Sequence, residues 1–179
     1  MLSIDVDDTI EKLEKMGARK ILLQLPDGLK PHVFEYFNQL SSRFSVIVSS
    51  DPFYGACDVG NEEQYRDVDC IVQYGHSIIP NIKYPKPMIF QEARNDSTFS
   101  LTPEMFRDLQ EHGFRRIGLL SSIQYMDRMN EARDILKKMG FEVIVGNQDQ
   151  RLAYPGQVLG CNFSSAHSIS MDVDAYVIV

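Results

Sequence analysis

Short apolar runs of strand length alternate along the chain with stretches whose apolar residues recur every three or four positions. Strands that are apolar throughout are typical of parallel sheets covered by helices on both faces. Their alternation with helical stretches indicates an α/β protein. The predicted strands are residues 20–25, 45–50, 70–75, 87–92, 116–122, 141–146 and 175–179.

Two stretches between these runs have helical periodicity. The first follows Pro31, a residue that suits the first turn of a helix, and the second is expected to end at Gly140. Apolar residues three and four positions apart share one helix face, which is expected to be buried. The predicted buried residues are Val33, Phe34, Phe37 and Leu40 in the first helix, and Met126, Met129, Ala132, Ile135, Leu136 and Met139 in the second.

The order of elements recurs. Each half of the chain runs strand, helix, strand, a loop with a cysteine near a glycine, a short helical stretch and another strand. The tripeptide Asp-Val-Asp lies ten residues after Cys57 and eleven after Cys161, in the same place of both halves. The tripeptide also occurs at 5–7, outside this pattern, so the evidence for a repeat is its equivalent position in both halves and not its occurrence alone. We interpret the pattern as an internal repeat of about a hundred residues.

A polar stretch near 93–113 separates the two repeats. We expect residues 1–100 to form one small Rossmann-like parallel-sheet unit that carries the Cys57 loop. Residues 101–179 are expected to form a second unit that carries the Cys161 loop and is incomplete at its C-terminus, because no helix follows to cover its last strand.

Composition narrows the class of protein. A hydrophobic content of 44% and a charged content of 24% are those of a globular protein. The net charge of −7 gives no electrostatic case for nucleic acid or anionic membranes. No apolar run approaches the ~20 residues of a membrane span, and the N-terminal stretch has no signal-peptide pattern. Three cysteines do not suggest a secreted disulfide framework. We therefore expect a cytoplasmic protein.

The repeat distinguishes the cysteines. Cys57 and Cys161 occupy equivalent loops, each beyond the C-terminal end of the second strand of its unit. That edge of an open parallel sheet is where ligands bind. Cys70 aligns with Ala175 at the start of an apolar strand, and free cysteine in such a place acts as a small buried hydrophobe.

Several chemistries remain open for the loop cysteines from the residues alone. Zinc is disfavoured because no CxxC or HxxxH spacing accompanies them. A disulfide between them is disfavoured in a reducing cytosol. His76 could activate a catalytic thiolate, but a nucleophile needs no second copy. Two equivalent soft ligands fit an iron–sulfur cluster, which cysteine thiolates hold.

Five segments closely resemble the archaeal diphthamide synthase, or 2-(3-amino-3-carboxypropyl)histidine synthase, family: "LQLPDGLK", "DPFYGACDVG", "YGHS", "SSIQYMDRMNEARDILKKMGFEVIVG" and "YPGQVLGCNFSSA". The resemblance implies three similar α/β units around a pseudo-threefold axis, of which this chain has two. It implies that each unit gives one cysteine to a single [4Fe-4S] cluster whose fourth iron binds S-adenosylmethionine. Cys57 and Cys161 are then two of the three ligands.

The resemblance also implies a reaction, the first step of diphthamide biosynthesis on translation elongation factor 2. An external electron donor reduces the cluster, and the Cγ–S bond of S-adenosylmethionine is cleaved. The resulting 3-amino-3-carboxypropyl radical adds to C2 of a histidine imidazole of the factor, and methylthioadenosine is released. The family suggests a homodimer.

The chain has only two of the three ligating cysteines, and two alternatives to this reaction remain. One is a non-catalytic partner subunit of such an enzyme. The other is a quinolinate-synthase-like iron–sulfur dehydratase, which resembles the family in its triplicated architecture and three-cysteine cluster.

Further candidate residues lie at the same sheet edges, directly after predicted strands. Some of them also suit an ordinary structural role: Pro26, Asp27 and Gly28 could form a turn and start a helix, and His76 could be a hydrogen-bonded structural histidine. The candidates for binding S-adenosylmethionine are Pro26, Asp27, Gly28, His76, Ser121, Ser122 and Gln124.

Overall fold

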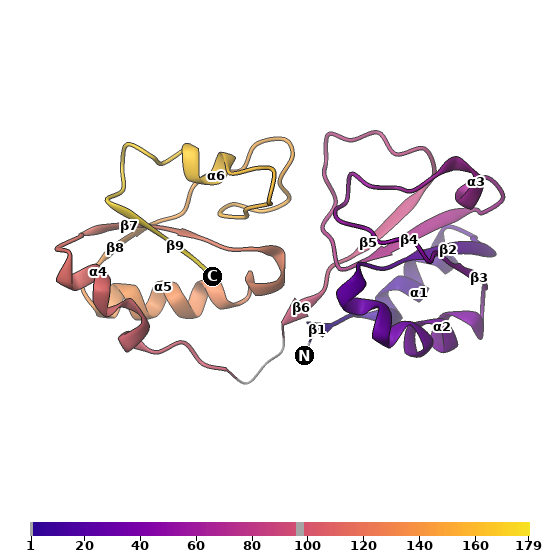
Figure 1. The fold of residues 1–179 in the computed structure, drawn as a ribbon, viewed down its shortest axis with the longest axis horizontal. Coiled ribbons are helices and arrows are strands. Elements are labelled where there is room, and N and C mark those ends of the chain that lie inside the picture. The colour runs from indigo at the N-terminus through magenta and orange to yellow at the C-terminus, as the bar shows by residue number, and fades with distance from the viewer. Residues whose placement is uncertain (1, 96–98) are drawn as a thin grey trace. The chain divides into compact units, whose positions relative to one another are not determined.

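The computed structural model describes residues 2–95 and 99–179, which form two compact units (Figure 1). One unit is Ser3–Ala93, and the other is Arg94–Val179 together with Leu2. Residues 96–98 of the polar stretch near 93–113 lie outside the described residues. A short two-stranded sheet joins β1 (Leu2–Ser3) to β6 (Arg94–Asn95).

The first unit contains a four-stranded sheet in which all neighbouring strands run parallel. Its order is β3-β2-β4-β5, so β2 and β4 lie in the middle of the sheet. Nearly all of their residues are buried. The parallel sheet predicted from the apolar runs is confirmed. The bounds are β2 (Lys20–Gln24), β3 (Ser45–Val48), β4 (Cys70–Tyr74) and β5 (Met88–Gln91).

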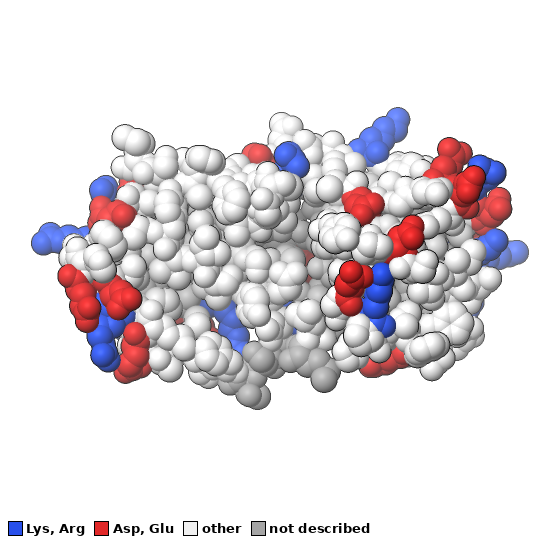
Figure 2. Space-filling model, viewed as in Figure 1, with Lys and Arg blue, Asp and Glu red and all other residues white. Residues whose placement is uncertain are grey.

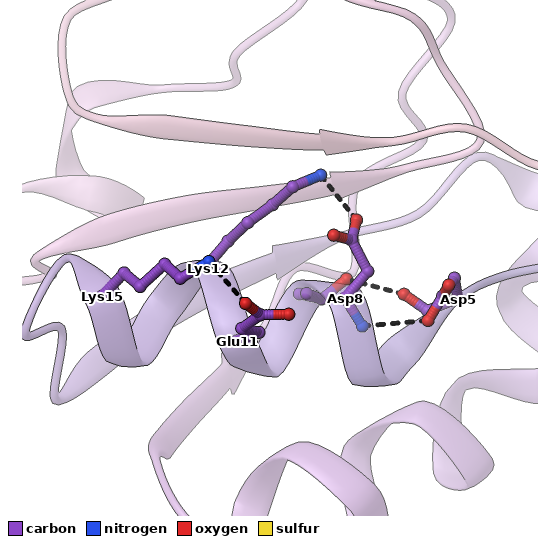
Figure 3. Close-up of polar contacts among 6 residues, drawn as sticks. Asp5, Asp8, Glu11, Lys12 and Lys15 are labelled. Carbon is purple, nitrogen blue, oxygen red and sulfur yellow. Dashed lines mark hydrogen bonds and ion pairs between the residues drawn. The ribbon is translucent and has the colours of Figure 1, made fainter.

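Helices cover both faces of this sheet: α1 and α2 lie below it and α3 above it in Figure 1. The elements are α1 (Val6–Lys15), the 3₁₀ helix η1 (Asp27–His32), α2 (Val33–Ser41) and α3 (Glu62–Tyr65). Asp5 caps α1, because its carboxylate accepts the Asp8 N–H at 2.9 Å (Figure 3). On the exposed face of α1, Lys12 pairs with Asp8 and Lys15 with Glu11, at the i, i+4 spacing that favours such pairs on a helix.

The predicted buried face of α2 is wrong at one position. Phe34 is 76% exposed, whereas Tyr36 and Leu40 are buried. Positions 33, 36, 37 and 40 form the true stripe, since they are spaced at i, i+3, i+4 and i+7. Tyr36 belongs to that stripe because its ring packs edge-on against Tyr74, with ring centroids 5.2 Å apart.

The second unit has a three-stranded parallel sheet in the order β8-β7-β9. In Figure 1, α5 and α6 lie on opposite faces of this sheet. Helix α5 buries Met129, Ala132 and Leu136 in the core, and Met126, Ile135 and Met139 pack against it, which confirms the predicted face. The elements are η2 (Pro103–Phe106), α4 (Arg107–Glu111), β7 (Arg116–Leu120), η3 (Ile123–Tyr125), α5 (Arg128–Lys138), β8 (Glu142–Ile144), α6 (Ser164–His167) and β9 (Ala175–Ile178).

Strand register relates the two units residue by residue. Ile21 in β2 pairs with Cys70 in β4, and Ile117 in β7 pairs with Ala175 in β9. The predicted alignment of Cys70 with Ala175 is therefore seen in the backbone pairing. The central strands β2 and β7 each have one parallel neighbour from the following strand and one from the strand after that.

The Asp-Val-Asp tripeptide has the same task in both units. The carboxylate of its last residue accepts two backbone N–H groups at the start of the central strand, all at 2.9 Å. These bonds are the main cause that lowers the pKa of both carboxyl groups. The tripeptide thus fixes the strand starts in register. The acceptors and donors are Asp69 with Arg19 and Lys20, and Asp174 with Arg115 and Arg116.

The two sheets differ in the sizes of the side chains at one equivalent pair of positions. Leu22 in β2 packs against Ile71, while the equivalent pair in the second unit is Gly118 and Tyr176. The Tyr176 ring occupies the space of the missing side chain, because a Cβ on Gly118 would lie 2.6 Å from it. A large residue facing a small one keeps the packing volume that two medium residues give in the first unit.

Acidic and basic side chains lie interspersed on the face of the molecule shown in Figure 2. Within residues 2–95 and 99–179, none of the helices has the length and apolar content needed to span a bilayer.

Candidate metal centre

The three cysteines have two kinds of environment. Cys57 and Cys161 are exposed, whereas Cys70 is buried at the start of β4. Burial raises the pKa of the Cys70 thiol to about 11, so this group stays a protonated core side chain. The prediction that Cys70 belongs to the core is confirmed. The two loop thiols remain accessible to a metal.

The Cys57 loop is anchored by buried apolar residues that precede the exposed thiol. Phe53 and Ala56 are both buried, and the Asp58 N–H donates to the Gly55 carbonyl at 3.0 Å, which closes a turn around Cys57. The position of an added Cβ on Gly55 lies 3.7 Å from the Cys57 sulfur. A glycine there keeps the space beside the sulfur open.

Two buried glutamines in the strands of the sheet support the Cys57 loop. Gln24 ends β2, Gln73 lies in β4, and both are fully buried. Gln24 Nε2 donates to the Val59 carbonyl at 2.9 Å. Gln73 Nε2 donates to the Asp58 carbonyl at 2.8 Å and to Gln24 Oε1 at 3.2 Å. The two residues that follow Cys57 are therefore tied to the central strands.

His76 joins the same network at the C-terminal end of β4. Its Nδ1 lies 3.1 Å from Gln73 Oε1. Because Gln73 Nε2 donates to two other acceptors, Oε1 must accept here, and His76 carries its proton on Nδ1. Burial lowers the pKa of His76 and favours this neutral form. Its Nε2 is then a hydrogen-bond acceptor.

Gly75 permits the close approach of two strand ends in the first unit. Its φ is +93°, and an added Cβ would lie 3.0 Å from Pro26 Cγ. A left-handed backbone beside a packed proline ring requires glycine here. The turn after β2 and the turn after β4, which carry candidate residues, are thereby brought together.

The Cys161 loop is held by backbone pairing. Ser121, directly after β7, donates its N–H to Gly156 and accepts from the Val158 N–H, both at 2.9 Å. The fully buried Gln157 accepts the N–H groups of Ala153 and Tyr154 through Oε1, at 2.9 and 3.2 Å. The Pro-Gly-Gln part of the segment therefore fixes the approach of the loop to the strand.

Polar side chains surround the turn that contains Cys161. Asn162 Nδ2 donates to both carboxylate oxygens of Asp149, at 3.0 and 3.1 Å. The Arg151 N–H donates to the same carboxylate at 2.8 Å, and this bond is the main cause that lowers the pKa of Asp149. The Arg151 Nη2 lies 3.7 Å from the Cys161 sulfur.

The remaining predicted site residues have described structural roles, and their contact with a ligand stays a prediction. Pro26, Asp27 and Gly28 begin η1, where Asp27 pairs with Lys30 at 2.7 Å. Ser121 is fully buried, and its hydroxyl lies within hydrogen-bonding distance of the carbonyls of Ser122 and Val179. Ser122 and Gln124 are half-buried at the start of η3.

The residues that support the loops are not among the predicted site residues. Gln24 and Gln73 were detectable as single polar residues inside otherwise apolar strands, since a buried polar side chain needs a partner. Asp149, Arg151 and Asn162 lie in irregular segments, where periodicity carries no signal.

The donor set fits an iron–sulfur cluster. Thiolates are the protein ligands of such clusters, and each unit presents one accessible thiol after its second strand. Over residues 2–95 and 99–179, no group of three or more His, Cys, Asp or Glu side chains is gathered to hold a metal ion.

Comparisons with known proteins point to one family. The model of the family described as "Putative diphthamide synthesis protein" matches residues 25–179. The 2-(3-amino-3-carboxypropyl)histidine synthase of Pyrococcus horikoshii is 31% identical over 166 residues, which are 91% of this chain and 48% of that protein. Subunit 1 of the enzyme of that name in Schizosaccharomyces pombe is 28% identical over 191 residues, covering 98% of this chain and 42% of the relative.

Solved structures agree with the sequence comparison. The crystal structure of Dph2 from Pyrococcus horikoshii superposes with a TM-score of 0.85 at 29% identity, covering 99% of this chain and 52% of that one. A second crystal structure of that protein, with the same TM-score, contains a 4Fe-4S cluster. The likeness confirms the α/β fold with parallel sheets. The chain spans about half the length of the relatives it matches.

Proposed function

Because the chain belongs to the diphthamide synthesis protein family, we propose that the protein containing it transfers a 3-amino-3-carboxypropyl group from S-adenosylmethionine to a histidine of translation elongation factor 2. The names of the relatives support the transferred group and the histidine acceptor. The observation that carries the proposal is the pair of accessible thiols, one in each unit, on loops that follow equivalent strands.

The proposed cofactor is a [4Fe-4S] cluster, to which Cys57 and Cys161 each give one thiolate. The cluster in Dph2 of Pyrococcus horikoshii supports it. When bound, the cluster supplies the electron for cleavage of the Cγ–S bond of S-adenosylmethionine. The set of protein ligands is completed by a third thiolate that is not Cys70, because Cys70 is buried and protonated.

Residues of this chain have supporting tasks in the proposal. Gln24 and Gln73 hold the Cys57 loop through the carbonyls of Val59 and Asp58. His76, held neutral with its proton on Nδ1, presents Nε2 as an acceptor for a donor group of S-adenosylmethionine. The other proposed contacts with S-adenosylmethionine are Pro26, Asp27, Gly28, Ser121, Ser122 and Gln124.

The partners follow from the reaction. Elongation factor 2 is the proposed protein substrate, and an external electron donor reduces the cluster. We further propose a cytoplasmic homodimer, as the family resemblance suggests.

Cysteine variants of the complete protein test the proposal. Cys57→Ala and Cys161→Ala should each lower the iron content after anaerobic reconstitution and abolish methylthioadenosine release and elongation-factor modification. Cys70→Ala is the matched control, expected to cost about 1 kcal/mol of stability while iron content stays at the wild-type level. Equal iron loss in all three variants would contradict the assignment of the ligands.

A partner-subunit role is the second candidate, and one observation favours it. The relative from Schizosaccharomyces pombe is named as subunit 1, so in that organism the enzyme has more than one subunit. The same reconstitution separates the two roles. Turnover by the complete protein alone supports the self-sufficient enzyme, whereas turnover only after addition of a second cluster-bearing subunit supports the partner role. Formation of quinolinate in place of methylthioadenosine would instead indicate a dehydratase.

A further inference from the structure

The guanidinium of Arg151 is the charged group beside the candidate ligand thiol of the second unit. Its Nη2 lies 3.7 Å from the Cys161 sulfur, within hydrogen-bonding range for sulfur. The segment between Arg151 and Asp172 contains no Asp, Glu, Lys or Arg. The loop that carries Cys161 therefore brings no other formal charge of its own to the sulfur.

The backbone of Arg151 is fixed relative to Cys161 by a shared carboxylate. Asp149 accepts the Arg151 N–H at 2.8 Å and the amide of Asn162, the residue directly after Cys161, at 3.0 and 3.1 Å. Asn162 also accepts the Ser164 N–H through Oδ1 at 2.8 Å. These bonds place the start of the guanidinium side chain and the turn of the thiol in one network.

The Cys57 loop of the first unit contains no Lys or Arg between Asp51 and Gly60. The loop is held by the neutral amides of Gln24 and Gln73, which bind backbone carbonyls after Cys57 and do not reach its sulfur in the described contacts. The two thiols thus differ in the charges beside them: Cys161 has a cationic donor at its sulfur, whereas Cys57 is followed directly by the acidic Asp58.

We infer that Arg151 donates a hydrogen bond to the Cys161 thiolate and thereby raises the reduction potential of the cluster that this thiolate holds. Hydrogen bonds to cysteine sulfur and the net charge around a cluster are two of the factors that set its potential. The reduced cluster is more negative by one charge, so a nearby cation and donor stabilise it more than the oxidised form. The inference rests on the proposed function, since it requires Cys161 to be a ligand.

A redox titration of the complete, anaerobically reconstituted protein tests the inference. In Arg151→Met, which keeps side-chain bulk and removes both charge and donor, we expect the equilibrium constant for reduction to fall about tenfold. That change is about 59 mV to more negative potential for a one-electron couple. Arg151→Lys keeps the charge and should lie between the two. The Fe–S(Cys) stretching band in the resonance Raman spectrum should move to higher wavenumber in Arg151→Met, because the sulfur loses its hydrogen bond.

Arg115→Met is the matched control, because it removes the same charge at the opposite, N-terminal end of β7, where the backbone N–H and not the side chain binds Asp174. Its potential should equal that of the wild type. A wild-type potential in Arg151→Met, or a shift no larger than that of Arg115→Met, would overturn the inference.

Two further measurements distinguish a failure of the inference about Arg151 from a failure of the proposed function. If Arg151→Met does not retain a cluster, Arg151→Gln replaces it, since glutamine keeps an N–H donor without charge. Its potential should still lie below that of the wild type, and an unchanged value would refute the role of the charge. Full iron content in Cys161→Ala would show that Cys161 is not a ligand, which contradicts the proposed function whatever the Arg151 variants do.

Discussion

Replacing Gln73 with leucine would remove the amide that ties the Cys57 loop to the middle of the first sheet. The substitution is nearly equal in volume, so it changes hydrogen bonding more than packing. Three groups lose their partner: the Asp58 carbonyl at 2.8 Å, Gln24 Oε1 at 3.2 Å and His76 Nδ1 at 3.1 Å. No other contact described for these three groups replaces the hydrogen bond that each of them loses.

The expected cost follows from the burial of these groups. An unpaired buried polar group costs about 1–3 kcal/mol. Gln24 is fully buried, so its Oε1 bears the full penalty, while the loop carbonyl and His76 are partly exposed and recover some bonding from water. We expect a total of about 3 kcal/mol against the closed loop, which is roughly a hundredfold increase in its opening.

Hydrogen exchange measured on peptides that cover residues 55–60 of the complete protein reads this opening directly. Gln39→Leu is the control, because Gln39 is exposed on α2 and makes a single long bond to the Glu35 carbonyl at 3.4 Å. The double variant Gln24→Leu/Gln73→Leu removes both buried partners at once and should cost less than the sum of the single variants. Exchange in Gln73→Leu that matches the control, or strictly additive costs, would refute the view that the two amides act as one support.

Two other predictions concern the stability of the second sheet, and hydrogen exchange in peptides from β7 would test both. Gly118→Ala should destabilise the unit by about 1–3 kcal/mol, because the new Cβ would lie 2.6 Å from Tyr176, and adding Tyr176→Val should recover much of the loss. Backbone hydrogen bonds lower the pKa of Asp174, so its stabilising contribution is present above the ordinary value of 3.8 and is lost as the pH falls below it. Asp174→Asn should therefore remove part of the acid sensitivity of the strand start, and an unchanged pH profile would contradict this reasoning.

The strands were the most predictable part of the fold. Each of the seven predicted runs contains a strand of the structure, because a continuous apolar run bounded by polar or turn residues has few other buried conformations. The strand ends were overestimated, as at 141–146, where only Glu142–Ile144 pairs. The neighbouring strand β7 continues to Leu120, so β8 leaves the sheet before its neighbour ends, and a single sequence does not show where this happens.

Side-chain orientation was predictable only where the chemistry of the residue was unambiguous. The face of α5 was predicted correctly from methionine, alanine and leucine. The predicted face of α2 is wrong at Phe34, which lies next to Val33 and points away from the stripe, while Tyr36 is buried against Tyr74. A tyrosine ring offers a large apolar surface to the core despite its hydroxyl.

The supports of the candidate ligand loops escape a repeat comparison for a physical reason. By strand register, Gln24 and Gln73 are equivalent to Leu120 and Ile178 of the second unit, so the repeat gives no sign of a shared role at these positions. A parallel sheet fixes where each loop leaves its strand, and that is why the cysteines recur. The loop then needs only partners for its backbone groups, and either a buried amide or another stretch of backbone satisfies that need. The first unit uses the amides and the second uses the pairing of Ser121 with Gly156 and Val158. The position of a candidate ligand is therefore set by topology and is readable from the sequence, whereas its support differs between the units and has to be found in the structure.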